Sequence, residues 1–100
     1  MLIVVGKAKL GEGALDAGRI ALSAMIEASR AEEGCVDYSY AADILDPSTM
    51  HIIEKWVDEA ALTTHFQTPH MATFQKALGD LDVQIIEVLK FQSDDGAPLM

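Results

Sequence analysis

The chain has 100 residues, of which 50% are hydrophobic and 23% are charged. This length and composition are typical of one globular domain with its own core, and they exclude a disordered chain. The 16 acidic residues outnumber the 7 lysines and arginines, which gives a formal net charge of −9. Because so acidic a chain repels phosphate backbones, we expect no nucleic-acid partner.

The chain also lacks the marks of membrane proteins and of disulfide-rich proteins. No apolar run is long enough to span a bilayer, and no basic segment precedes the apolar start, so we expect neither a membrane partner nor a signal peptide. Cys35 is the only cysteine, which excludes an internal disulfide and suits a reducing compartment. A cytoplasmic location is therefore expected.

Hydrophobic periodicity predicts the first elements of the chain. Residues 2–10 alternate imperfectly and are rich in valine, which predicts a strand that the Gly11-Glu12-Gly13 turn ends. Residues 14–30 repeat apolar side chains with the period of an amphipathic helix. Gly34 is a candidate for the left-handed cap of this helix.

A hairpin follows. Residues 35–44 are rich in Val, Tyr and Ile, which predicts a strand. Residues 50–57 place successive side chains on alternate faces and are predicted as the next strand. Asp46-Pro47-Ser48 is a turn signal between them. The short connection predicts that the two strands pair antiparallel.

Two short helices come next. Asp58 is a suitable N-cap for a helix over residues 59–66. Thr68 can cap a second helix with Pro69 at its first position, and this helix runs to about Leu78.

With a last strand at residues 83–91, the order is β-α-β-β-α-β, the ferredoxin-like α+β arrangement. We expect a four-stranded antiparallel sheet with two helices on one face. The domain would span residues 1–92, and residues 93–100 would form a C-terminal tail that is mobile or reaches a partner.

The strands are apolar on both faces. The opposed sets are Ile3 and Val5 against Leu2 and Val4 in the first strand, and Ile86 and Val88 against Val83, Ile85 and Leu89 in the last. Helices from one chain cover one face only, and an exposed apolar patch of this size is uncommon on a monomer. We therefore expect a homodimer in which the open faces of two sheets pack together.

Side chains that could carry chemistry gather between Cys35 and Phe74. They are Tyr38 and Tyr40 in the second strand, Glu54 and Trp56 in the third, and His65, Phe66, His70 and Phe74 in the later helices. They converge only if the predicted fold is correct.

His65 is the first candidate for catalysis, because imidazole titrates near neutral pH and can move a proton. The helix dipole favours its charged form and burial favours the neutral form. The structural alternative is a histidine that bonds a carbonyl at the helix end, which is the more frequent role.

The other candidates also have two interpretations. Glu54 lies among apolar residues, where an ionised carboxylate needs a partner; it is either a base with a raised pKa or, more commonly, an acceptor for a histidine or a backbone donor. Trp56 is a core residue or a ligand wall. Tyr38 and Tyr40 either donate to an oxyanion or pack at the hairpin or dimer seam.

A metal or nucleotide cofactor is not expected. His65 and His70 are five residues apart with Pro69 between them, so the zinc spacing of four is absent. Cys35 has no second cysteine, and there is no glycine-rich nucleotide loop.

The segment EKWVDEAALTTHFQTPH, residues 54–70, is similar to the signature of the antibiotic biosynthesis monooxygenase family. Glu33-Gly34-Cys35 followed by Tyr38 resembles the E-x-G-C-x-x-Y pattern with which the family begins its second strand. The resemblance covers about residues 1–92. It implies a dimeric α/β barrel in which each subunit has a pocket between sheet and helices.

The resemblance also implies an activity. Relatives oxygenate quinol, phenolic or polyketide-like aromatic substrates with molecular oxygen and without metal or flavin. It implies that His65 handles a proton or binds an oxyanion, that Tyr38, Tyr40 and Trp56 position the substrate, and that Glu54 orients a partner. Phe66, His70 and Phe74 would complete the substrate site.

Some members of the family have other roles. Haem-degrading relatives need an asparagine on the first strand and a tryptophan near the second helix; here the strand carries Gly6, Lys7 and Lys9, and the later helix has Gln75, so haem degradation is disfavoured. Two alternatives to a monooxygenase stay open. One is a non-catalytic dimeric ligand-binding or stress-related module of the same fold, and the other is a related isomerase that uses the same histidine.

Overall fold

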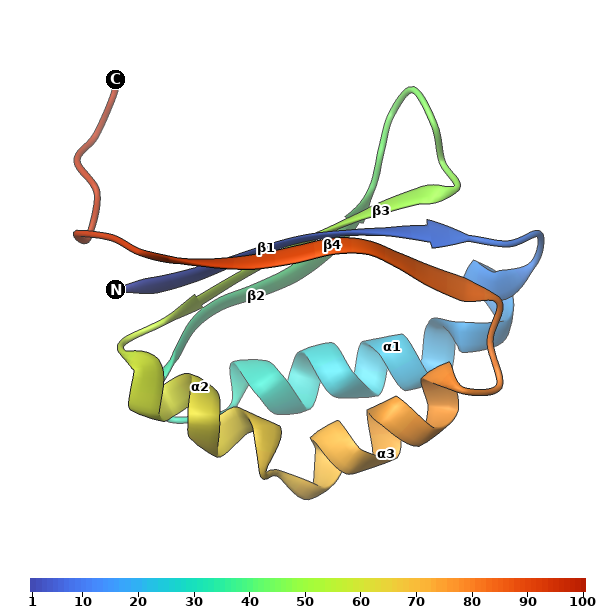
Figure 1. Cartoon of the computed structure of the whole chain (residues 1–100), viewed down its shortest axis with the longest axis horizontal. Helices are drawn as coiled ribbons and strands as arrows, with labels where there is room; N and C mark the ends of the chain where they lie inside the picture. Colours follow the sequence, from blue (N-terminus) through green and yellow to red (C-terminus); the bar gives the residue numbers. More distant parts are fainter.

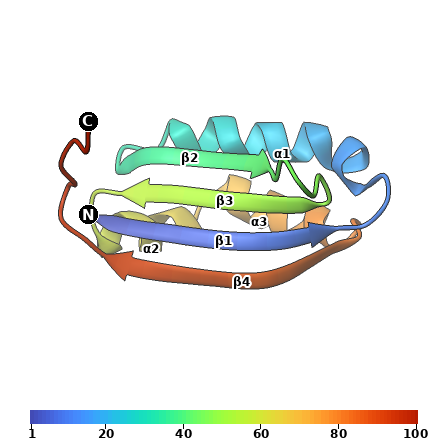
Figure 2. The same cartoon turned by 90° about the horizontal axis from the view of Figure 1, so that it is seen from above.

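Four antiparallel strands form one sheet, and three helices cover one of its faces (Figure 1). The computed structural model describes residues 1–100. The elements in chain order are β1 (Leu2–Leu10), α1 (Ala14–Arg30), β2 (Cys35–Ala42), β3 (Thr49–Trp56), α2 (Glu59–Phe66), α3 (Pro69–Leu78) and β4 (Val83–Gln92). The strand order β2-β3-β1-β4, visible from above in Figure 2, confirms the predicted ferredoxin-like α+β fold. None of the helices combines the length and the apolar character that crossing a membrane requires.

The β2–β3 hairpin differs slightly from its predicted limits. β2 ends at Ala42, two residues before the predicted end, because the Asp43 side chain turns the chain. Its Oδ1 accepts hydrogen bonds from the backbone N–H groups of Leu45 and Asp46, at 2.8 and 3.2 Å. The loop then rises above the sheet on the side away from the helices (Figure 1).

The helix ends follow the predicted caps with one exception. Asp58 accepts from Ala61 N, Thr68 accepts from Met71 N, and Pro69 is the first residue of α3. Gly34 was predicted as a left-handed cap, and this is wrong, since its φ is not positive. Gly34 instead allows a close approach of α2, because a Cβ there would overlap the Cβ of Ala61.

The pairing of β4 with β1 confirms that the sheet is apolar on both faces. It also changes which residues of β4 lie on each face. Ile86 is an extra residue at a bulge opposite Lys7 and Ala8. Val88 therefore pairs with Gly6 on the helix side, together with Val83 and Ile85, whereas Leu89 pairs with Val5 on the open side.

The core lies between the sheet and the helices in two clusters. The larger contains Leu2, Val4, Met25, Tyr38, Trp56, Leu62 and Phe74, and the smaller contains Ala8, Leu10, Ala14, Met50 and Ile52. β4, at the sheet edge, contributes no fully buried residue, because the helices do not reach below it. The inner face of the sheet is thus open beside β4.

Candidate functional site

Three aromatic rings pack at the centre of the larger core cluster. Tyr38 comes from β2, Trp56 from the end of β3 and His65 from the last turn of α2, and each of these residues is at most 1% exposed. The His65 ring centroid lies 4.6 Å from that of Trp56 and 5.6 Å from that of Tyr38. His65 is therefore buried against two aromatic rings.

A carboxylate from the loop after α1 joins the two helix-borne histidines. Oε2 of Glu32 lies 2.6 Å from Nδ1 of His65 and 2.8 Å from Nε2 of His70. The connection between α2 and α3 fixes the positions of the His65 and His70 rings. Thr68 caps α3, and its hydroxyl donates to the His65 carbonyl at 2.8 Å. The side-chain partner of His65 is thus a carboxylate rather than the backbone carbonyl of the structural interpretation.

Glu54 has a partner of a different kind from those the sequence suggested. The indole Nε1 of Trp56 donates to its Oε1 at 3.0 Å. Burial raises the pKa of Glu54, while the Trp56 hydrogen bond and the neighbouring His65 oppose this shift. The carboxyl group therefore carries a desolvation cost when it is ionised.

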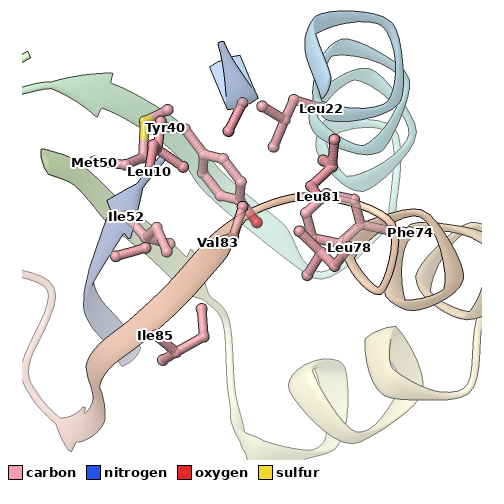
Figure 3. Close-up of a pocket in the computed structure, with 12 residues that line it drawn as sticks. Leu10, Leu22, Tyr40, Met50, Ile52, Phe74, Leu78, Leu81, Val83 and Ile85 are labelled. Carbon is pink, nitrogen blue, oxygen red and sulfur yellow. The ribbon is translucent and has the colours of Figure 1, made fainter. Parts of the chain in front are cut away.

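A cavity lies beside this cluster, over the smaller core cluster (Figure 3). Its walls come from the sheet, from α1 and α3, and from the loop before β4: Ala8, Leu10, Ala14, Leu22, Tyr40, Met50, Ile52, Phe74, Leu78, Leu81, Val83 and Ile85. The Tyr40 hydroxyl is the only side-chain oxygen or nitrogen among them, and Figure 3 shows it pointing between the sheet residues and the helix residues. The cavity can therefore hold an apolar molecule and offer it one hydrogen bond.

The cavity is small. Its volume is about 60 Å³, whereas an engineered apolar cavity that binds benzene measures about 150 Å³. A substrate ring needs the side chains at the open edge near Leu81 and β4 to move.

The predicted site residues divide into two groups. Tyr40 and Phe74 line the cavity. Tyr38, Trp56 and His65 form the buried ring cluster, which Glu54 and His70 border. Phe66 stacks outside His65 and is exposed, so it belongs to neither the cavity nor the core. The Tyr38 and Tyr40 hydroxyls, 2.8 Å apart, connect the two groups.

The sequence did not lead us to predict Glu32 or the aliphatic residues of the cavity wall as site residues. Glu32 occupies the first position of the E-x-G-C pattern, so the motif contained the signal. Residues such as Leu81 and Val83 carry no signal, because an aliphatic cavity wall has the same composition as a core.

One set of residues could hold a metal ion. The ligand atoms of Glu32, His65 and His70 all lie within 4.8 Å of one another. The five-residue spacing of the two histidines does not keep them apart, because the chain changes direction between α2 and α3. Glu32, in the loop after α1, supplies the third ligand.

Comparisons with known proteins identify relatives of this chain. A Synechocystis protein, sll1783, which is uncharacterized, is 40% identical over 70 residues, covering 69% of this chain and 48% of that protein. The Escherichia coli protein named "Probable quinol monooxygenase YgiN" is 34% identical over 68 residues, covering 59% of this chain and 65% of that protein. The matches thus span about half to two thirds of these relatives' lengths.

The fold is shared with solved structures. The crystal structure of a candidate antibiotic biosynthesis monooxygenase from Deinococcus radiodurans aligns with a TM-score of 0.89 at 25% identity, covering 100% of this chain and 99% of that one. The family sequence model described as "Antibiotic biosynthesis monooxygenase" matches residues 1–77. The chain is therefore a member of the antibiotic biosynthesis monooxygenase family.

Proposed function

We propose that the chain is a cofactor-independent monooxygenase that hydroxylates a small quinol, phenol or polyketide-like aromatic compound. The observation that carries the proposal is the apolar cavity with Tyr40 as its single hydrogen-bond donor. The name of the E. coli relative supports the quinol class.

The reaction balances without a cofactor. A quinol and O₂ give a hydroxyquinone and water: one oxygen atom enters the ring and the other leaves as water. The ring supplies all four electrons, two on becoming a quinone and two as a C–H bond becomes C–OH. The quinol passes its proton to water at the edge of the cavity, and the protein needs to supply only a largely dry site and stabilisation of the ring oxyanion.

Tyr40 is the group that meets the substrate in this proposal. Burial raises the pKa of Tyr40 to about 12, so its hydroxyl stays protonated and can donate to a ring oxyanion. Phe74 also lines the cavity, with its ring centroid 6.3 Å from that of Tyr40, and offers an aromatic substrate a second ring to pack on.

The buried cluster holds Tyr40 in place. Tyr38 bonds the Tyr40 hydroxyl, and His65 and Trp56 pack on Tyr38. We assign His65 a positioning role through Tyr38, since His65 does not line the cavity. Glu54 keeps Trp56 oriented through its indole N–H.

The dimer belongs to the same proposal. On the open face, Val5, Ile53, Leu89 and Phe91 are adjacent by register and remain 43–49% exposed. A second copy of the sheet matches this surface, because a two-fold axis brings the same apolar patch onto itself. Burial of the face in a dimer also makes the sheet a more rigid wall for the cavity.

The test is oxygen consumption with menadiol as the probe, followed by mass spectrometry of the product formed under ¹⁸O₂. The proposal expects one labelled oxygen atom in the hydroxyquinone. Tyr40→Phe should lower kcat/KM by about a hundredfold, and Ile20→Ala, on the exposed side of α1, should not change it. If the wild-type protein oxidises neither menadiol nor simpler quinols faster than buffer does, the quinol assignment is wrong.

A further inference from the structure

The Glu32, His65 and His70 cluster combines two imidazoles and one carboxylate around a single point. This ligand set binds zinc in several metalloenzymes, and it leaves a fourth coordination position open. Around a tetrahedral ion with bonds of 2.0–2.2 Å, the ligand atoms lie about 3.3–3.6 Å from one another. Here Oε2 lies 2.6 and 2.8 Å from the two nitrogens and all three atoms lie within 4.8 Å, so the carboxylate has to move away from the nitrogens and the two nitrogens have to approach each other, each by about 1 Å.

The three ligands are held by separate, fixed parts of the fold. His65 is 1% exposed and is packed between Tyr38 and Trp56. His70 is the second residue of α3, whose start is fixed by the Thr68 cap. Glu32 lies in the loop that follows α1, and this loop lines one groove together with Ala61 and Thr64 of α2. Such preorganisation lowers the entropy cost of binding an ion.

The surroundings favour a cation. Glu33 lies in the same groove as Glu32, and the charge of Glu32 acts on the nearby Glu54. The nearest cation along the chain, Arg30, is directed to β2, where its Nε donates to the Tyr38 carbonyl at 2.8 Å. The whole chain carries a net charge of −9.

The cluster is accessible from solvent. An open groove between the loop after α1 and α2 is lined by Glu32, Thr64 and Thr68. Oε1 of Glu32 has no hydrogen-bond donor, and it is not buried, because every buried side-chain oxygen and nitrogen has a partner. The groove gives an ion a path to the carboxylate, and the hydroxyls and water there can complete its coordination.

We propose that Glu32, His65 and His70 bind one divalent transition-metal ion of the Zn²⁺ class. The ion replaces the two hydrogen bonds that converge on Oε2. Each imidazole then binds the ion through a nitrogen without a proton and keeps one proton on its other ring nitrogen, and any second proton is released to water. None of the three residues lines the apolar cavity, so the ion ties α2, α3 and the loop after α1 together and takes no part in oxygen chemistry. The proposal holds whether or not the chain is a monooxygenase.

The test uses full-length protein without a polyhistidine tag, treated with EDTA and dialysed, and titrates it with Zn²⁺ by calorimetry. One equivalent should bind, the melting temperature should rise, and Co²⁺ should give the visible absorption bands of a tetrahedral site. His70→Ala and Glu32→Gln should each weaken Zn²⁺ binding at least about tenfold. Circular dichroism establishes that both variants are folded.

The chain provides a matched control in His51, its third histidine, which pairs with Asp43 at the β2–β3 hairpin. His51→Ala should leave Zn²⁺ affinity unchanged. Failure of the wild-type protein to bind Zn²⁺ or Co²⁺ overturns the proposal. Binding that survives in His70→Ala and Glu32→Gln, or that His51→Ala removes, overturns it as well, because the ion is then held elsewhere.

Discussion

Tyr38 and Tyr40 lie two residues apart on β2, and their hydroxyl oxygens are 2.8 Å apart. Tyr38 is buried in the core, and Tyr40 lines the cavity. Burial raises the pKa of both hydroxyls, and the hydrogen bond from Tyr38 opposes the shift at Tyr40. With Tyr38 as the donor in this pair, the Tyr40 proton remains available to a molecule in the cavity.

This pair of hydroxyls predicts coupling between the two tyrosines. Tyr38→Phe and Tyr40→Phe should each lower the free energy of unfolding by about 1–2 kcal/mol, because each leaves one buried polar group without its partner. The double variant removes both hydroxyls, so its loss should be smaller than the sum of the two single losses by about 0.5 kcal/mol or more. Urea unfolding of the four proteins checks this, and strictly additive losses would show that the hydroxyls do not interact.

The raised pKa of Glu54 predicts a pH-dependent cost to stability. Below its ordinary pKa of 4.5 the carboxyl group is protonated in both the folded and the unfolded chain. As the pH rises above that value, the unfolded chain ionises first, and stability falls until the pH passes the raised folded-state pKa. Glu54→Gln removes this cost and can still accept from Trp56.

The measurement is the urea midpoint of wild type and Glu54→Gln at pH 4 and pH 7. The variant should gain stability relative to wild type at pH 7 and gain little at pH 4. Glu27→Gln is the matched control, since Glu27 is exposed on α1 and its replacement changes net charge equally. An equal gain in both variants would attribute the effect to net charge.

The fold was predictable because its signals are local. The caps at Asp58 and Thr68, the helical period of α1 and the turn between β2 and β3 each depend on a few adjacent residues. The bulge at Ile86 was not predictable, because no glycine or proline marks it and its faces are set by pairing with β1. The prediction for Gly34 failed for a similar reason, since its neighbour Ala61 is distant along the chain.

The candidate site was predictable only in part. The family motif contains Tyr38, Glu54, Trp56, His65 and His70, and these residues do lie close together. The contact between Glu32 and the histidines joins residues 33 and 38 positions apart, so the E-x-G-C pattern marks Glu32 but does not indicate its partners.

The contact between Gly34 and α2 predicts a packing defect on substitution. In Gly34→Ala the new methyl group overlaps Ala61, and the backbone there is fixed because the Gly34 carbonyl accepts from Val57 N at 2.9 Å. We expect a loss of about 1–3 kcal/mol in the free energy of unfolding. Gly79→Ala is the control: its φ of −62° suits alanine and nothing lies closer than 3.4 Å to the added Cβ, so stability should stay within about 1 kcal/mol of wild type. Chemical denaturation distinguishes the two, and equal stability of both variants would contradict the contact.

The apolar open face of the sheet predicts that a charged substitution there will prevent dimer formation. Leu89 lies beside Val5 at the centre of the apolar patch, and an aspartate there would be buried without a partner in a face-to-face dimer. Leu89→Asp should therefore yield a folded monomer at micromolar concentration, while wild type sediments as a dimer. Ile20→Asp introduces the same charge at an equally apolar residue, 87% exposed on α1 on the opposite side of the molecule, and it should remain dimeric. A wild-type monomer would remove the dimer from the proposed function, and monomers from both variants would show that added charge rather than the sheet face sets the assembly.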